Sequence, residues 1–268
     1  MKIRAKNKEH LVDVLTTFKY EKKYHLLFRL AMGGNLSDFW RTSSTALGHD
    51  SICWLAQQCH GLADGLDGIH NAKLSVREVN EVQVPRNPQP SSGQSAMWVG
   101  ARPATPTTDK EDCGRHGDIK PQNILWFKQD QNEFGLGTLK ISDFGLTTFH
   151  TALNTKVDKE STNVTITYAP PEWEMEENIS RPFDIWSLGC VYLEFITWAL
   201  LGSEGIVEFR EKRMADKDSG EKFHSDNFYA ELGDDETHHV IVKSSVTQVS
   251  SPTLWVASPQ VTLTYKII

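Results

Sequence analysis

The sequence has few cysteines and no segment of the kind that directs a chain into a membrane. Four cysteines occur among 268 residues, with neither a C-x-x-C pair nor the spacing of a zinc finger. The first ten residues, MKIRAKNKEH, lack the apolar core of a signal peptide. The longest apolar stretch, CVYLEFITWALLG, contains a glutamate and falls short of the ~20 residues that a membrane span needs. These absences predict an intracellular protein, cytoplasmic or nuclear and not secreted, with reduced thiols and no membrane contact.

Basic residues are also in the minority, with 28 Lys and Arg against 35 Asp and Glu and a formal net charge of −7. Because nucleic-acid phosphates require a basic surface, this balance predicts no nucleic-acid partner. The length and a hydrophobic content of 39% suit a globular chain of one large or two small domains. These bulk properties leave the oligomeric state open.

The pattern of apolar residues predicts both strands and helices. Two short strands are expected within residues 8–32, and GGNLSDFW then offers a turn and the start of a helix. From Ser51, apolar residues recur every three or four positions, which predicts an amphipathic helix with Ile52, Leu55, Cys59, Leu62, Leu66 and Ile69 on its inner face. NILWF and TLKISDF read as the two strands of a hairpin, and FDIWSLGCVYLEFITWAL as a buried helix.

Two segments differ in composition from the rest. Residues 71–115 contain five prolines among Ser, Gly and Thr, which predicts a long flexible insertion. Residues 240–268 are rich in Val, Thr and Ser and contain neither an acidic residue nor an arginine. We expect this second segment to form a divergent or disordered tail.

The stretch RHGDIKPQNILWF, followed by DFGL, carries the chemistry of phosphoryl transfer. Asp118 and Asn123 stand five residues apart, which places a carboxylate and an amide on one tight loop. Asp118 would accept the proton of an attacking hydroxyl, and Lys120 would direct a cation at the transferring phosphoryl group. Asn123 and Asp143 supply the oxygen ligands that Mg²⁺ prefers. The alternative is that these residues are polar turn residues at strand ends.

The motifs HGDIKPQN, DFG, YAPPE and DIWSLG occur in the order and rough spacing of eukaryotic protein kinases, which the chain resembles. HGDIKPQNILWF is most similar to kinase-like proteins of filamentous fungi. The resemblance implies an α+β protein-kinase-like fold, with a mostly helical large lobe and an incomplete β small lobe. It also implies serine/threonine kinase activity on a protein substrate, with ATP and Mg²⁺ as cofactors.

By this resemblance Asp118 is the catalytic base, Lys120 contacts phosphate, and Asn123 and Asp143 hold the metal. It further implies that Thr165 pairs with the loop lysine, that Glu172 ends the activation segment, and that Asp184 braces the catalytic loop. YHLLFRLAMGGNLSDFW is similar to the strand that leads into the kinase hinge. There Phe28 would guard the back of the nucleotide pocket, Arg29, Leu30 and Ala31 would face the adenine, and Asn35 would contact the ribose.

The chain departs from the kinase pattern at both ends. No G-x-G-x-x-G precedes Phe28, and even Lys2 is too close to Phe28 to be the strand lysine, because a helix, two strands and their connections need roughly 35 residues. We therefore expect an N-terminally truncated kinase or an imperfect gene model. Residues 1–34 would be the remnant of the small lobe and hinge, 35–239 the large lobe with its insertion, and 240–268 the tail.

These departures leave other functions open. A pseudokinase or scaffold would keep the large lobe while holding ATP poorly. A small-molecule phosphotransferase also has HGD followed by Asn, but Lys120 and the pair YAPPE and DIWSLG argue against it. Because 240–268 has no arginine, we expect Glu172 to lack a partner. Gly117 stands where many kinases have Arg, which argues against control by phosphorylation at Thr147, Thr155 or Ser161.

Overall fold

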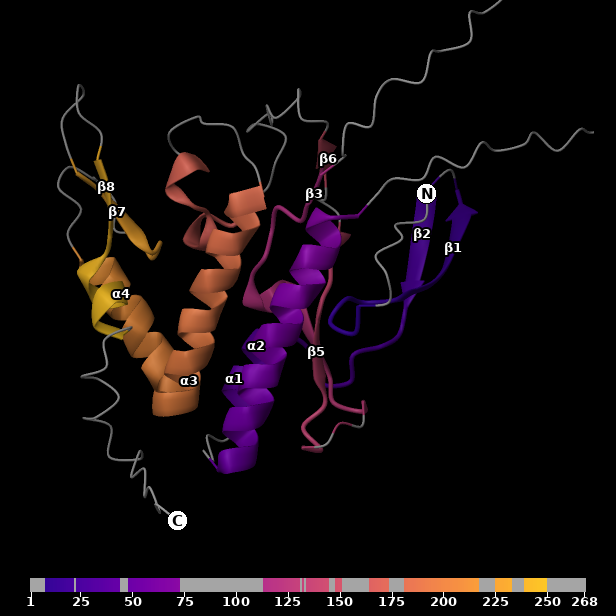
Figure 1. The fold of residues 1–268 in the computed structure, drawn as a ribbon, viewed down its shortest axis with the longest axis horizontal. Helices are drawn as coiled ribbons and strands as arrows, with labels where there is room; N and C mark the ends of the chain where they lie inside the picture. Colours follow the sequence, from indigo (N-terminus) through magenta and orange to yellow (C-terminus); the bar gives the residue numbers. More distant parts are fainter. Residues whose placement is uncertain are drawn as a thin grey trace, which may run out of the picture.

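The computed structural model describes residues 8–21, 23–43, 48–72, 113–130, 132, 134–144, 148–150, 164–173, 181–216, 225–232 and 239–249. In these residues the chain is α+β, with helices and four separate two-stranded antiparallel sheets. Helices α2 (His49–His70) and α3 (Arg181–Ala215) occupy the middle of the molecule (Figure 1). The hairpin of β1 (Val14–Tyr20) and β2 (Lys23–Phe28) lies on one side, and that of β7 (Tyr229–Leu232) and β8 (His239–Val242) on the other.

The N-terminal hairpin confirms the two strands predicted within residues 8–32. Its register runs from Val14 opposite Phe28 to Tyr20 opposite Lys23. Every residue of β1 is exposed, although several of them are large and apolar. Cross-strand contacts such as the stacking of Phe18 on His25 therefore support this hairpin, and burial in the core does not.

The turn after β2 leads into helix α1 (Leu36–Thr42) and lies against Trp126. The helix begins with a capping box, in which Asn35 Oδ1 accepts from the N–H of Asp38 and Asp38 Oδ2 accepts from the N–H of Asn35. Just before it, the N–H of Gly33 donates to the carbonyl of Trp126 at 3.1 Å. A Cβ on Gly33 would overlap the indole of Trp126, so only glycine allows this close approach.

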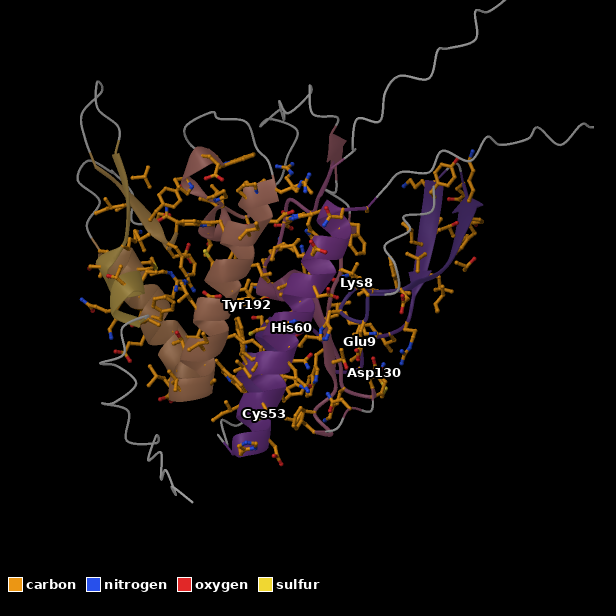
Figure 2. The ribbon with its side chains drawn as sticks, in the orientation of Figure 1. Lys8, Glu9, Cys53, His60, Asp130 and Tyr192 are labelled. Carbon is orange, nitrogen blue, oxygen red and sulfur yellow. The ribbon has the colours of Figure 1, made fainter. Side chains whose placement is uncertain are left out.

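The predicted hairpin of NILWF and TLKISDF is confirmed as β4 (Ile124–Phe127) and β5 (Thr138–Ile141). Helix α2 packs against β5, where Gln58 Oε1 accepts from the N–H of Leu139 at 2.8 Å. Figure 2 shows Tyr192 of α3 beside α2, where its hydroxyl donates to the carbonyl of Cys59. The hairpin and the two long helices are thereby joined around one core.

The amphipathic face of α2 was predicted correctly except at its start. Leu62, Leu66 and Ile69 are buried as expected, but Ile52 is 50% exposed. Trp54 is buried in its place, because the indole N–H donates to the carbonyl of Gly137 and the ring packs on α1 and α3. An aromatic side chain with a polar contact has displaced a smaller aliphatic one from the core.

Helix α3 is the apolar helix that the sequence predicted to be buried. By length and composition alone this helix could cross a membrane. However, 56% of its 18-residue apolar window is buried inside the protein. Gly202, at φ +76°, interrupts the helical geometry and divides α3 into two segments. The first segment supplies Phe195 and Trp198 to an aromatic core shared with Phe39 of α1, as expected of a core helix.

Two segments that differ in composition from the rest contain regular structure at one end. Within the insertion predicted at 71–115, β3 (Cys113–Arg115) pairs with β6 (Thr148–His150), and residues 73–112 lie outside the described part. The tail at 240–268 is ordered at its start, where β8 is followed by α4 (Ser244–Val249). Val246 and Val249 pack on α3, and Asp216 accepts from the N–H of Ser245. Residues 250–268 are not described.

Candidate active site

Asp118 precedes the 3-10 helix η1 (Pro121–Asn123), and three side chains bind its carboxylate. The Lys120 ammonium lies 2.7 Å from Oδ2, and Thr165 donates its hydroxyl to Oδ1 at 3.0 Å. Asn123 donates its amide to Oδ2 at 2.9 Å. Lys120 also donates to the Thr165 hydroxyl oxygen at 2.8 Å, which closes a ring of contacts. The structure thus brings together four residues that the sequence assigned to one site.

Asn123 connects this loop to the strand that leads to Asp143. Its amide nitrogen donates to both the backbone carbonyl and the carboxylate of Asp118, so the acceptor of the side chain, its amide oxygen, takes no part in these two bonds. Its backbone carbonyl accepts from the N–H and the hydroxyl of Ser142, at 2.8 and 2.9 Å. Asp143 follows with an exposed side chain and φ of +62°, a conformation that few non-glycine residues adopt. An amide oxygen and an exposed carboxylate held on neighbouring segments fit Mg²⁺, which is bound by one or two carboxylates together with substrate phosphates.

Asp184, at the start of α3, holds the backbone of the loop. Its two carboxylate oxygens accept from the N–H of His116 and of Gly117, each at 2.8 Å. His70 of α2 also lies 2.9 Å from Oδ2. The carboxylate is fully buried, so these bonds to a charged acceptor are strong. This position accords with the bracing role that the resemblance implied.

His116 is fully buried, and both of its ring nitrogens bond to backbone groups. Its Nε2 bonds the carbonyl of Ser142 at 2.8 Å, and its Nδ1 accepts from the N–H of Asp118 at 3.2 Å. These partners require the neutral ring with its proton on Nε2. Burial lowers the pKa of His116, and this outweighs the nearby charge of Asp184.

The predicted hinge residues lie beside the end of β4 and the turn that follows it. Phe28 ends β2, and Arg29 forms an ion pair with Asp130 at 2.9 Å. The carbonyl of Leu30 accepts from the amide of Gln129, and that of Ala31 accepts from the N–H of Gly34. The Asn35 side chain, expected at the ribose, caps α1 instead. Any nucleotide contact of this segment would therefore compete with these internal bonds.

Glu172 lies in the 3-10 helix η5 (Pro171–Trp173), and no ion pair of it is found among the residues with described positions. Arg213, in the second segment of α3, pairs with Glu194. The three phosphorylation candidates Thr147, Thr155 and Ser161 lie outside the described residues.

A cavity of about 600 Å³ opens beside the loop, on the side of Lys120 and Thr165. Its lining also includes Glu194 and Arg213 of α3, which the sequence motifs do not assign to the site. Tyr168, in η4 (Ile166–Tyr168), donates to Glu194 at 2.8 Å, and burial raises the pKa of Tyr168. The sequence feature that could have indicated this part of the lining is Glu194, a glutamate within an otherwise apolar helix. A buried carboxylate needs partners, so polar side chains were to be expected around it.

Residues 112–231 match the family model of the protein kinase domain. Similar curated proteins include a probable cyclin-dependent kinase 8 of Dictyostelium discoideum, 36% identical over 83 residues, and cyclin-dependent kinase 4 of Mus musculus, 35% identical over 86 residues. A probable cell division protein kinase of Encephalitozoon cuniculi is 43% identical over 84 residues. Each match covers 31% of this chain but only 21%, 24% and 28% of the respective relative. The chain therefore spans about a quarter of the length of the curated relatives it matches.

Proposed function

Because this chain belongs to the eukaryotic protein kinase family, we propose that it transfers a phosphoryl group from Mg-ATP to a serine or threonine of a protein. The observation that supports the proposal is the ring of contacts among Asp118, Lys120 and Thr165. It fixes a carboxylate beside an ammonium group, as a reaction that deprotonates a hydroxyl and moves phosphate requires.

In this proposal Asp118 accepts the proton of the substrate hydroxyl as its oxygen bonds to phosphorus. Lys120 stabilises the negative charge of the transferring phosphoryl group. Asn123 and Asp143 would hold Mg²⁺, which neutralises the phosphate oxygens of ATP. Three described cysteines carry free thiols, in keeping with the proposal that the protein acts in a reducing, intracellular compartment.

A second candidate is a kinase-like scaffold that does not turn over ATP. It is favoured by the segment expected to bind the nucleotide, because the carbonyl of Leu30 accepts from Gln129 and the Asn35 side chain caps α1. A small-molecule phosphotransferase is disfavoured, because Thr165, in the segment expected to bind a peptide, contacts the catalytic-loop residue Lys120.

Calorimetry of ATP binding with Mg²⁺ and with EDTA tests the first step. We expect Mg²⁺-dependent binding to wild-type protein and to Asp13→Asn, which alters an exposed carboxylate outside the site, and its loss in Asp143→Asn. If none of the folded proteins binds ATP, the enzyme proposal fails and the scaffold remains.

Phosphotransfer from labelled ATP to serine, threonine and small-molecule acceptors tests the second step. Asp118→Asn should reduce the rate by about 10²–10⁴-fold, the usual contribution of a positioned base. Thr165→Val should reduce it as well, while Thr165→Ser keeps the hydroxyl and most of the activity. Transfer that is unaffected by Asp118→Asn would contradict the assigned role.

A further inference from the structure

The cavity beside the catalytic loop lies where residues flanking a substrate hydroxyl would be placed. One wall is formed by Lys120 and Thr165, both of which contact Asp118. The other is formed by Arg210 and Arg213 of α3 and by Asp226, which precedes β7. Whatever fills the cavity is therefore close to the proposed base.

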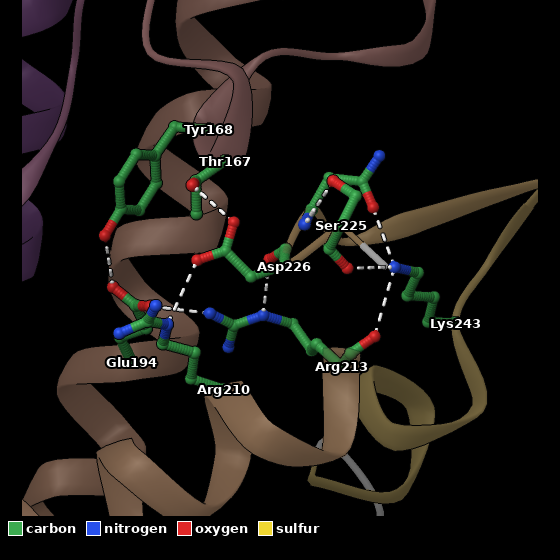
Figure 3. Close-up of polar contacts among 9 residues, drawn as sticks. Thr167, Tyr168, Glu194, Arg210, Arg213, Ser225, Asp226 and Lys243 are labelled. Carbon is green, nitrogen blue, oxygen red and sulfur yellow. Dashed lines mark hydrogen bonds and ion pairs between the residues drawn. The ribbon is translucent and has the colours of Figure 1, made fainter. Parts of the chain in front are cut away.

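The acceptors in this wall are already occupied (Figure 3). Glu194 accepts from the Tyr168 hydroxyl through Oε2 and from Arg213 through Oε1, at 2.8 and 3.0 Å. Asp226 accepts from the Thr167 hydroxyl through Oδ1 at 2.6 Å, and its Oδ2 lies 3.3 Å from Arg210 Nε. Both carboxylates are thus neutralised by arginines from their own chain. A basic side chain entering the cavity would find no unpaired carboxylate in this wall.

Donors in the same wall are not all used. Arg210 is 61% exposed and its Nε lies 3.3 Å from Asp226 Oδ2, and no hydrogen bond of its two terminal nitrogens is found among the described residues. Arg213 is only 1% exposed, and its buried Nη1 has no hydrogen-bond partner there either. The rings of Phe209 and Phe228, 4.3 and 4.1 Å from its guanidinium carbon, hold it in place. Open guanidinium donors beside filled acceptors favour an anion.

We infer that this cavity binds an acidic or phosphorylated side chain of the protein segment that carries the acceptor hydroxyl. Arg210 would bind the carboxylate or phosphate through its terminal nitrogens, a geometry that suits a planar guanidinium. The inference rests on the proposed function for the identity of the partner. The inferred preference for acidic peptides is the reverse of what the whole-chain charge of −7 would give, because that charge by itself would attract basic peptides.

Fluorescence anisotropy with short labelled peptides, in the absence of ATP, tests this inference. The peptides share a central serine and carry glutamate, phosphoserine, glutamine or lysine at the flanking positions. We expect the glutamate or phosphoserine peptide to bind at least roughly tenfold more tightly than the lysine peptide, the effect of about one charge-assisted hydrogen bond. The glutamate and phosphoserine arms distinguish a carboxylate ligand from a phosphate ligand. Equal binding, or tighter binding of the lysine peptide, would overturn the inference.

Two variants with the same change in charge locate the effect. Lys212 is on the same helix, 52% exposed, paired with Glu208, and outside the cavity wall. Arg210→Glu should abolish or reverse the preference for acidic peptides, while Lys212→Glu should preserve it. Equal losses in the two variants would show long-range attraction without a site, which also overturns the inference.

The outcome is independent of catalysis, because no phosphate is transferred in the binding assay. An acidic preference that depends on Arg210, in a protein without phosphotransfer activity, supports the site and removes the enzyme proposal. Phosphotransfer activity in a protein that shows no preference for acidic peptides supports the enzyme proposal and removes the proposed binding site.

Discussion

Arg213 and Glu194 form a buried ion pair at 3.0 Å, with side chains that are 1% and 5% exposed. The pair joins the two segments of α3 on either side of the interruption at Gly202. Buried charges are costly without a partner, so each depends on the other for its compensation.

We predict that Arg213→Met lowers the free energy of unfolding by about 3–5 kcal/mol, because it leaves the Glu194 carboxylate buried without a cation. The double variant Arg213→Met with Glu194→Leu should recover much of that loss. Urea denaturation of the two single variants and the double variant measures the coupling. Strictly additive losses would show that the two side chains do not act as a pair.

Asp184→Asn should destabilise the protein by about 2–4 kcal/mol, since an amide replaces a charged acceptor of two buried N–H groups. The matched control is Asp13→Asn, which changes an exposed aspartate and should stay within about 0.5 kcal/mol. Chemical denaturation compares them, and hydrogen exchange at His116 and Gly117 reports the loop directly. Unchanged protection of these two amides would contradict the bracing role.

Stability should fall as the pH drops below about 6.5, the ordinary pKa of histidine. Burial lowers the pKa of His116 in the folded state, so between that lowered value and about 6.5 the unfolded chain binds more protons and stability is lost on acidification. Protonation would also remove the acceptor for the N–H of Asp118. His116→Gln should reduce the slope of stability against pH by up to about 1.4 kcal/mol per pH unit.

Denaturation curves between pH 7 and 5 provide this test. The pKa of His10 is lowered by burial as well, so wild-type and variant slopes are compared in the same background. Identical slopes would assign the acid sensitivity to other groups.

Lys243→Met, a change between β8 and α4, should lower the free energy of unfolding by about 2–3 kcal/mol. The Lys243 ammonium is buried, and it donates to the carbonyls of Arg213 and Ser225 and to the side chain of Asn227. Methionine preserves the length of the side chain but leaves these acceptors unsatisfied. Lys212→Met, at an exposed ion pair, should change stability by no more than about 0.5 kcal/mol. If the two variants changed the free energy of unfolding equally in urea denaturation, the stabilising role of the buried Lys243 hydrogen bonds would be contradicted.

Local sequence determined much of this protein. Apolar periodicity placed the N-terminal strands, the second hairpin and both long helices, because each pattern matches the repeat of its element. The motif HGDIKPQN placed Asp118, Lys120 and Asn123 on one loop, because residues that are close in sequence are necessarily close in space. The assignment of Asn35 to a ribose depended on resemblance alone, and local capping competes with it.

Tertiary structure decided what joins distant segments. The resemblance implied the contact of Thr165 with Lys120. Nothing local indicates that Glu194 pairs with Arg213, or that residues 239–249 close the core. Trp54 replaced Ile52 in the core because the shape of the facing surface selects among apolar side chains. Periodicity and motif spacing therefore determined the elements and the catalytic loop, whereas the packing of chain segments far apart in sequence decided the cavity, its charges and the end of the fold.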